Sequence, residues 1–108
     1  MTDSENIVGG RNVVKLSQPK FSLGTAVITP DAAAALQRIG QSAWSLISQH
    51  IAGQWGQLED EDKQANEDAL IQGDRLFSSY LLNDGVTIVW CITEADRSST
   101  CLLLPENY

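Results

Sequence analysis

The order of apolar and polar positions predicts a strand and then a helix near the start of the chain. Residues 21–28, FSLGTAVI, suit a short strand. Thr29, Pro30 and Asp31 then mark a helix start, because threonine caps helices, proline suits the first helical position and aspartate suits the first turn. Gly40 ends this helix. Its buried side is expected to carry Ala33, Leu36 and Ile39.

A second helix is predicted between Ser42, which can cap it, and Gly53, which can end it. Leu46 lies outside the apolar stripe of this helix. We expect Trp55, in the tight segment that follows, to fill core space from a loop. The residues that recur at helical spacing, and that we expect to face the core, are Trp44, Ile47 and Ile51.

Residues 60–72 form a third predicted helix, which has few apolar positions. Glu59 or Asp60 can cap it, and acids in its first turn interact favourably with the helix dipole. Gly73 is its expected end. A thin apolar side is predicted for Ala65, Ala69 and Leu70.

The last third of the chain has the pattern of strands joined by turns. Residues 76–82 run into the turn sequence NDG at 83–85, a hairpin signal. Residues 86–93, VTIVWCIT, are rich in β-branched and aromatic side chains, which favour a central strand. The polar residues 96–99 form a second turn. Residues 100–104 form the last strand, which ends before a proline.

Together these elements predict an α+β fold. It has an N-terminal strand, two to three helices, and a three-stranded antiparallel meander with the helices packed on one face. The length of 108 residues suits a single domain. Residues 21–108 are expected to form that domain, and the polar residues 1–20 are expected to form a flexible arm.

The net charge of −7 restricts the classes of partner. Binding to nucleic acid or to an anionic membrane needs clustered Lys and Arg, which this chain lacks. An acidic protein instead attracts basic partners. The start of the chain lacks the apolar run of a signal peptide, and no segment is apolar for long enough to span a membrane. The sequence therefore predicts a cytoplasmic protein with no direct contact to nucleic acid or membrane.

The two cysteines and the single histidine do not form a metal-binding pattern. Cys91 and Cys101 fall among apolar residues of predicted strands, where free cysteines are commonly buried and reduced. A disulfide between them is the alternative if their strands are neighbours. No CxxC or HxxxH spacing accompanies His50, so no metal is predicted. Glycine patterns typical of phosphate or dinucleotide binding are missing as well, so no cofactor is predicted.

Between Glu59 and Asp74 the chain carries seven acids and one lysine, which together give −6 of the net charge. The run EDED at 59–62 lacks the spaced pattern of a calcium loop. One interpretation is a solvated helix whose acids suit the helix dipole. The other is a surface that imitates nucleic-acid phosphates and docks on a basic protein groove. Its partner-binding residues would be Glu59, Asp60, Glu61, Asp62, Glu67, Asp68 and Asp74.

His50 also allows two interpretations. At the end of the second predicted helix it can satisfy the last backbone carbonyls, which is a structural role. As a general base it would need partners within hydrogen-bond distance. The polar stretch TEADRSST at 93–100, with Arg75, Ser78 and Tyr80, could bind a phosphate at one end of the sheet, or form a plain hairpin with an Asp-Arg pair. The residues of the catalytic alternative are His50, Arg75, Arg97 and Thr100.

Four stretches carry a resemblance to a known group of proteins. They are HIAGQWGQLEDEDKQAN at 50–66, RLFSSY at 75–80, WCITEADRSST at 90–100 and LLPENY at 103–108. In them the chain resembles small bacterial proteins that are carried on plasmids, integrative elements and prophages and labelled plasmid-related. The resemblance implies association with a mobile genetic element and a cytoplasmic location. It implies no activity.

A weaker similarity is to the small RNase toxins of the barnase, colicin and RelE type. Those proteins have a helix with a histidine followed by a meander with Arg, Ser and Thr at strand ends, and they cut RNA without metal. The counterparts here would be His50, Arg75, Arg97, Ser99 and Thr100. The chain departs from these toxins in charge, because an RNA-cutting domain usually presents a basic face.

The leading hypothesis is a small non-enzymatic interaction protein of a mobile genetic element. In its concrete form, the protein is an anti-CRISPR or anti-restriction inhibitor that docks residues 59–74 on a basic nucleic-acid-binding surface of a host defence complex. The alternative is a small metal-independent nuclease-like or toxin-like enzyme that uses His50 and Arg97. A third hypothesis, an antitoxin or transcriptional accessory protein, would rely on a basic arm with Arg11, Lys15 and Lys20.

Overall fold

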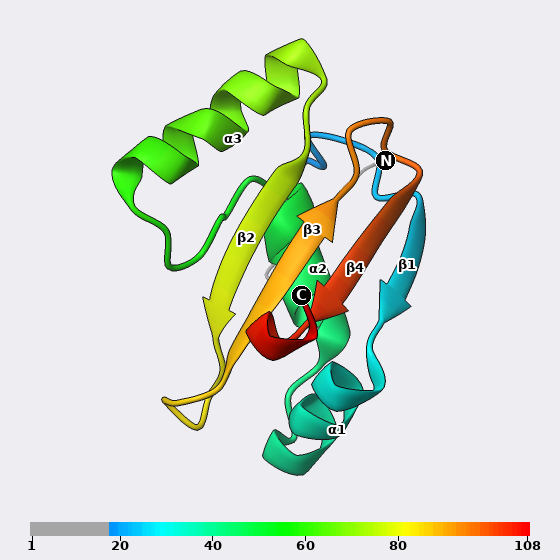
Figure 1. Cartoon of the computed structure of the whole chain (residues 1–108), viewed down its shortest axis with the longest axis vertical. Helices are drawn as coiled ribbons and strands as arrows, with labels where there is room; N and C mark the ends of the chain where they lie inside the picture. The colour runs from blue at the N-terminus through cyan, green and yellow to red at the C-terminus, as the bar shows by residue number, and fades with distance from the viewer. Residues whose placement is uncertain (1–17) are drawn as a thin grey trace, which may run out of the picture.

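The structure, a computed structural model, describes residues 18–108, which form an α+β fold with three α-helices and one four-stranded mixed sheet (Figure 1). The helices are α1 (Pro30–Ile39), α2 (Ala43–Ile51) and α3 (Asp60–Gln72), and the strands are β1 (Thr25–Ile28), β2 (Leu76–Leu81), β3 (Ile88–Thr93) and β4 (Ser99–Leu103). A 3-10 helix, η1 (Pro105–Asn107), follows β4. The first 17 positions of the arm expected over residues 1–20 lie outside the described residues.

The sheet contains one strand more than the predicted meander. β2, β3 and β4 are antiparallel neighbours, and β1 joins the β4 edge in parallel, which gives the order β1-β4-β3-β2. Hydrogen bonds from Thr25 N to Ser98 O and from Thr29 N to Leu102 O hold the two ends of this parallel pair. The three-stranded prediction was therefore incomplete. Because the partner of β1 lies beyond all three helices in the chain, no turn signal marks the pairing.

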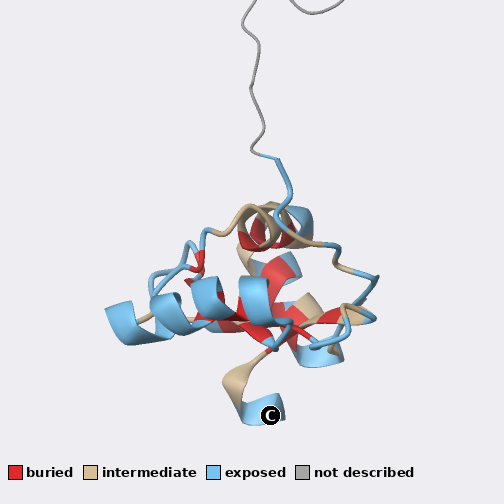
Figure 2. Cartoon of the chain, turned by 90° about the horizontal axis from the view of Figure 1, so that it is seen from above, coloured by how far each residue is buried: buried red, intermediate tan, exposed pale blue. Residues whose placement is uncertain are grey.

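α1 and α2 cover one face of the sheet, and the main core lies between these helices and that face (Figure 2). Side chains from both helices and from β3 and β4 meet there, among them Leu36, Leu46, Val89 and Leu102. α3 lies beyond the β2 edge of the sheet instead (Figure 1). The expected packing of helices on one face is therefore confirmed for α1 and α2, while α3 flanks an edge.

Local signals are confirmed at the starts of α1 and α2 and at the ends of α1 and α3. At the start of α3, Glu59 holds the N-cap position, but its side chain makes no capping hydrogen bond, so the predicted side-chain cap was wrong. The side chains of Thr29 and Ser42 accept hydrogen bonds from the first backbone N–H groups of α1 and α2. Gly40 ends α1 with a φ of 77°, and Gly73 ends α3 with a φ of 80°. These are left-handed conformations that glycine adopts without a steric penalty, and each lets a backbone N–H reach back to the last turn.

The predicted buried sides of the helices were partly wrong. In α2, Trp44 is 62% exposed and Leu46 only 1% exposed, the reverse of the prediction. The inward stripe of α2 follows the spacing of Ala43, Leu46, Ile47 and His50. In α1 the buried residues are Ala32, Ala35 and Leu36. In α3, Ala65 is exposed and Asn66 is buried in its place. The buried polar residues His50 of α2 and Asn66 of α3, and the exposed tryptophan of α2, shifted the sequence-based assignment in these two helices.

The two cysteines lie on opposite faces of the sheet. Cys91 pairs with Leu102 across β3 and β4, so the neighbouring Cys101 points to the other face. Cys91 is buried, Cys101 is half-buried, and both are free thiols. The disulfide alternative would need them on the same face.

The outer edge of β2 is covered by side-chain and loop contacts. Asn66 of α3 accepts a hydrogen bond from Phe77 N (3.0 Å) and donates one to Phe77 O (2.7 Å). Two residues further along, Ser79 N donates to Trp55 O and Ser79 O accepts from Gln57 N. These bonds satisfy an edge that would otherwise present free backbone groups, and they fix α3 to the sheet.

We expect Asn66→Ala to lower the free energy of unfolding by about 1–3 kcal/mol, because it leaves the Phe77 N–H and C=O without partners in a site that water reaches poorly. Gln64→Ala, an exposed change on the same helix, is the control and should stay within about 0.5 kcal/mol of wild type. Urea unfolding measures both. Equal stability of the two variants would show that Asn66 does not anchor α3.

Candidate functional site

His50 lies in the last turn of α2, with its side chain directed into the core. It is fully buried at 0% exposure. Its ring meets Phe21 edge-to-face at a centroid distance of 5.2 Å and Trp55 in the same way at 5.8 Å. Trp55 is only 4% exposed, which confirms that this loop tryptophan fills core space. The histidine is therefore enclosed by aromatic rings on the sides that the sheet does not cover.

Both ring nitrogens of His50 are hydrogen-bonded to hydroxyl groups of the sheet. Nδ1 lies 2.6 Å from Ser78 Oγ on β2, and Nε2 lies 2.9 Å from Thr93 Oγ1 on β3. Thr93 Oγ1 is 2.6 Å from Thr100 Oγ1 on β4. Thr100 Oγ1 in turn donates to the backbone carbonyl of Leu23, 2.7 Å away. A continuous chain of hydrogen bonds thus links α2, three strands and the segment before β1.

The carbonyl at the end of this chain fixes the direction of the bonds as far as His50. Because the Thr100 hydroxyl has one proton and gives it to Leu23 O, it accepts from Thr93. Thr93 then accepts from Nε2–H of His50, so the ring carries a proton on Nε2. In the neutral imidazole, Nδ1 accepts from the Ser78 hydroxyl.

Burial favours the neutral form of the His50 ring. Removal of the ring from water lowers the pKa of His50 from 6.5 to about 4, because the charged form loses its hydration. The Ser78–His50 pair has the spacing of a nucleophile and its base, yet both side chains are 0% exposed. A base or nucleophile must reach the substrate atom that it attacks. The geometry supports a structural role for this pair.

Arg97 belongs to a separate cluster at the β3–β4 turn, where its backbone has a φ of 62°. Its guanidinium lies over the ring of Phe21, which also contacts His50, with Cζ 5.7 Å from the ring centroid. It donates to four backbone carbonyls, those of Asp74 (2.7 Å), Ala95 (3.1 Å), Glu94 (3.2 Å) and Ala69 (3.2 Å). These bonds place a positive charge at the C-terminal end of α3, where it is favourable, and they occupy the groups that would bind a phosphate.

The structure therefore brings together only part of the catalytic alternative. His50 and Thr100 share the buried hydrogen-bond chain through Thr93. Arg97 is used by backbone carbonyls, and Arg75 is exposed with its Nε 3.9 Å from Glu94. Tyr80, considered with this set, donates to Gln54 O and is buried, which raises the pKa of its hydroxyl.

Ser78 and Thr93 were predicted as polar groups at one end of the sheet, and their contact with His50 was not predicted. Hydroxyl residues at buried positions of otherwise apolar strands are the signal that points to such a partner, because a buried hydroxyl needs a hydrogen bond. Lys20, the one described cation proposed for a basic arm, has its backbone N–H bonded to Ile51 O and its side chain against Gly53. Arg11 and Lys15 lie outside the described residues.

The acidic segment, residues 59–74, lies at the surface, in contrast to the buried His50. All seven of its acids are exposed, and within residues 18–108 none forms an ion pair. Glu67 accepts a hydrogen bond from Trp55 Nε1 at 2.9 Å, and Asp68 accepts one from the exposed Gln64 side chain at 3.0 Å. Ile71, on the last turn of α3, is 86% exposed. This surface combines dense negative charge with an exposed aliphatic side chain.

Comparisons with protein-family models, with curated proteins and with solved structures find no match to this chain. The resemblance to plasmid-related proteins of mobile elements therefore stays a prediction. In residues 18–108 no group of three or more His, Cys, Asp or Glu side chains is placed to hold a metal ion. In the same part of the chain, no helix combines the length and the apolarity needed to cross a membrane.

The lowered pKa of His50 predicts a loss of stability in mild acid. The histidine of the unfolded chain binds a proton near pH 6.5, and that of the folded chain only near pH 4. The contribution of neutral His50 to the free energy of unfolding is therefore complete above pH 6.5 and is lost as the pH falls from 6.5 to about 4. Between pH 7 and pH 5 the loss should be about 2 kcal/mol more for wild type than for His50→Gln.

A direct readout avoids dependence on a variant that does not fold. The chain has one histidine, so its ring protons give one NMR titration curve. We expect the imidazole to stay neutral in the folded protein at pH 5. A midpoint near the ordinary value of about 6.5 would contradict the buried, neutral assignment.

Proposed function

We propose that the protein is a non-enzymatic binding protein that docks the acidic segment, residues 59–74, on a basic surface of a protein partner. The observation that carries the proposal is the set of seven exposed acids on and around α3, none of which forms an ion pair with another residue of 18–108. Exposed carboxylates attract a basic partner, and they steer its approach.

The spacing of these charges favours competition with nucleic acid. α3 has 13 residues, which at about 1.5 Å per residue make a rod about 20 Å long. It carries five acids, about one per 4 Å, close to the roughly 3.4 Å between phosphates along one nucleic-acid strand. A basic groove shaped for a phosphate backbone would therefore find charges at a comparable spacing.

The mounting of α3 supports the same function. Asn66 ties the middle of the helix to the backbone of Phe77, and Arg97 ties its end to the β3–β4 turn. Rigid presentation lowers the entropy that is lost when the partner binds. Nearly all of the surface of this helix is polar, and only Asn66 and Ala69 are buried, so its position depends on these few anchors.

The narrower proposal is that the partner belongs to a host defence complex and that the protein is an anti-CRISPR or anti-restriction inhibitor encoded by a mobile genetic element, acting in the cytoplasm. Its support is the resemblance over roughly residues 24–108 together with the charge pattern. The enzymatic alternative, with His50 and Arg97 as catalytic residues, has less support. His50 is enclosed, and Arg97 is occupied by backbone carbonyls.

The test compares a variant that lacks three charges of α3 with a control that lacks three charges elsewhere. The test variant carries Asp60→Asn, Asp62→Asn and Asp68→Asn, and it spares Glu67 because that side chain holds Trp55. The control carries Asp31→Asn, Asp84→Asn and Asp96→Asn, exposed positions where an asparagine oxygen can still accept the bonds from backbone N–H groups and from Asn107. Asp84→Asn loses only the exposed bond from the Thr87 hydroxyl to Oδ2. Both variants have the same net charge.

We expect partners captured from a bacterial lysate by wild type to be retained by the control and lost by the test variant. At fixed partner concentration, loss of three favourable charges should weaken binding by about tenfold or more at low salt and by less at high salt. Quantitative mass spectrometry of the captured proteins provides the measurement. Equal recovery by the two variants would contradict a function that resides on α3.

A further inference from the structure

The face of the sheet opposite α1 and α2 is apolar over nearly its whole extent. Figure 1 looks onto this face, with α2 behind the strands and η1 in front of them. Because side chains alternate along strands, the register assigns the residues of this face. Its apolar members are Val27, Phe77, Leu81, Ile88, Trp90, Ile92, Cys101 and Leu103. We call this set the open face.

The open face departs from the usual pattern of a two-layer fold. A sheet with helices on one side commonly carries polar residues on the side that meets water. Here the polar positions of that side are Thr25, Ser79 and Ser99, mainly at its margin. Leu81 and Ile88 are each 40% exposed and Val27 is 47% exposed, whereas Ile92 and Leu103 of the same face are buried at 6% and 7%. Apolar side chains left in water along neighbouring strands indicate a binding surface.

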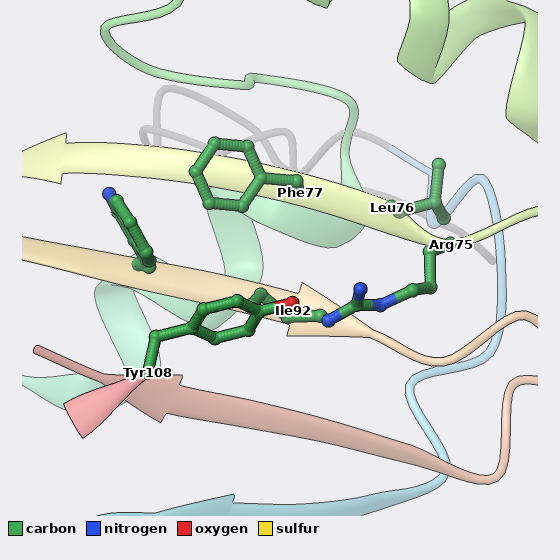
Figure 3. Close-up of a pocket in the computed structure, with 6 residues that line it drawn as sticks. Arg75, Leu76, Phe77, Ile92 and Tyr108 are labelled. Carbon is green, nitrogen blue, oxygen red and sulfur yellow. The ribbon is translucent and has the colours of Figure 1, made fainter. Parts of the chain in front are cut away.

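The open face contains a cleft of about 250 Å³, lined by Arg75, Leu76, Phe77, Trp90, Ile92 and Tyr108 (Figure 3). Trp90 meets Phe77 edge-to-face at 5.1 Å and Tyr108 at 5.8 Å. Arg75 reaches over the Tyr108 ring at 5.7 Å. Sites for drug-sized ligands occupy about 300–1,000 Å³, so this cleft suits one large side chain rather than a whole small molecule.

The charges around the cleft select the kind of partner. Arg75 is the cation of its rim, and Glu94 lies 3.9 Å from it. Glu106 of η1 and Asp74 before β2 add exposed negative charge. α3 lies beside the same face, beyond β2 (Figure 1). A segment lying on β2 and β3 therefore meets an apolar floor with acids along its side.

We propose that the open face binds a basic amphipathic segment of the protein partner, which inserts an apolar side chain into the cleft while its Lys and Arg residues meet the acids of α3. The inference rests on the proposed function and adds the second half of the interface. In such surfaces the anchor in a pocket supplies most of the affinity, whereas exposed charges act on the rate of association. A second copy is disfavoured as occupant, because each chain has a net charge of −7.

The probe is a synthetic amphipathic helix of leucine and lysine, and its control has the same lysines with serine in place of leucine. The three tryptophans of the protein give three indole N–H signals in NMR spectra. Trp90 lines the cleft, Trp44 is exposed on α2, and Trp55 is buried. We expect the leucine peptide to shift Trp90 and to leave Trp44 and Trp55 in place, and the serine peptide to shift none of them.

Two matched variants test the cleft. Tyr108→Ala removes an exposed wall and should weaken binding of the leucine peptide about tenfold. Trp44→Ala removes an aromatic side chain of similar exposure from the helix side and should leave the affinity unchanged. As a control, NMR spectra of both variants without peptide should show that the fold is retained.

The outcomes separate this inference from the proposed function. Suppose that the leucine peptide does not shift the Trp90 signal and that Tyr108→Ala binds this peptide as tightly as wild type, while the three-charge variant of α3 loses its captured partner. The cleft inference is then wrong and the proposed function stands. If neither variant loses binding, both are wrong. If the free protein sediments as a dimer that Tyr108→Ala dissociates, a second copy covers the open face and the inference is overturned.

Discussion

A neutral histidine at the centre of the core joins the layers of this protein. His50 bonds β2 through Ser78 and β3 through Thr93, and the chain continues through Thr100 to the segment before β1. Each hydroxyl in this chain donates its proton to a partner, and the hydroxyls of both threonines also accept one, so no polar group along it is left without a partner. The position of α2 on the sheet depends on these bonds. The same bonds hold the imidazole away from solvent and from the groups that would complete a catalytic site.

With the helix-covered face closed in this way, two surfaces remain for function. One is polar and strongly acidic, on α3, and the other is the apolar open face of the sheet. They lie side by side because Asn66 and Arg97 hold α3 at the β2 edge instead of over the sheet. A helix packed over the open face would have completed a three-layer fold. Its place beside that face leaves an apolar floor with a negative border, which a basic amphipathic segment complements.

Features that depend on neighbours in the sequence were predictable. The caps at Thr29 and Ser42, the left-handed glycine ends and the bounds of α3 follow from local chemistry. Features that depend on distant partners were not. The inward turn of Leu46 instead of Trp44 reflects where the sheet lies, and Asn66 is buried only because Phe77 offers a free backbone edge. The acids were named correctly as an exposed group, while the open face required the strand register to recognise.

The most direct test of the account is an isoleucine methyl NMR spectrum of the protein with a partner obtained by capture. Isoleucines report on each surface separately: Ile71 on α3, Ile88 and Ile92 on the open face, and Ile39, Ile47 and Ile51 in the helix layer. The account predicts that partner binding shifts the first three methyl signals and leaves the helix-layer signals unchanged. Shifts confined to the helix layer, near His50, would contradict it, because they would place the partner on the helix-covered side of the sheet.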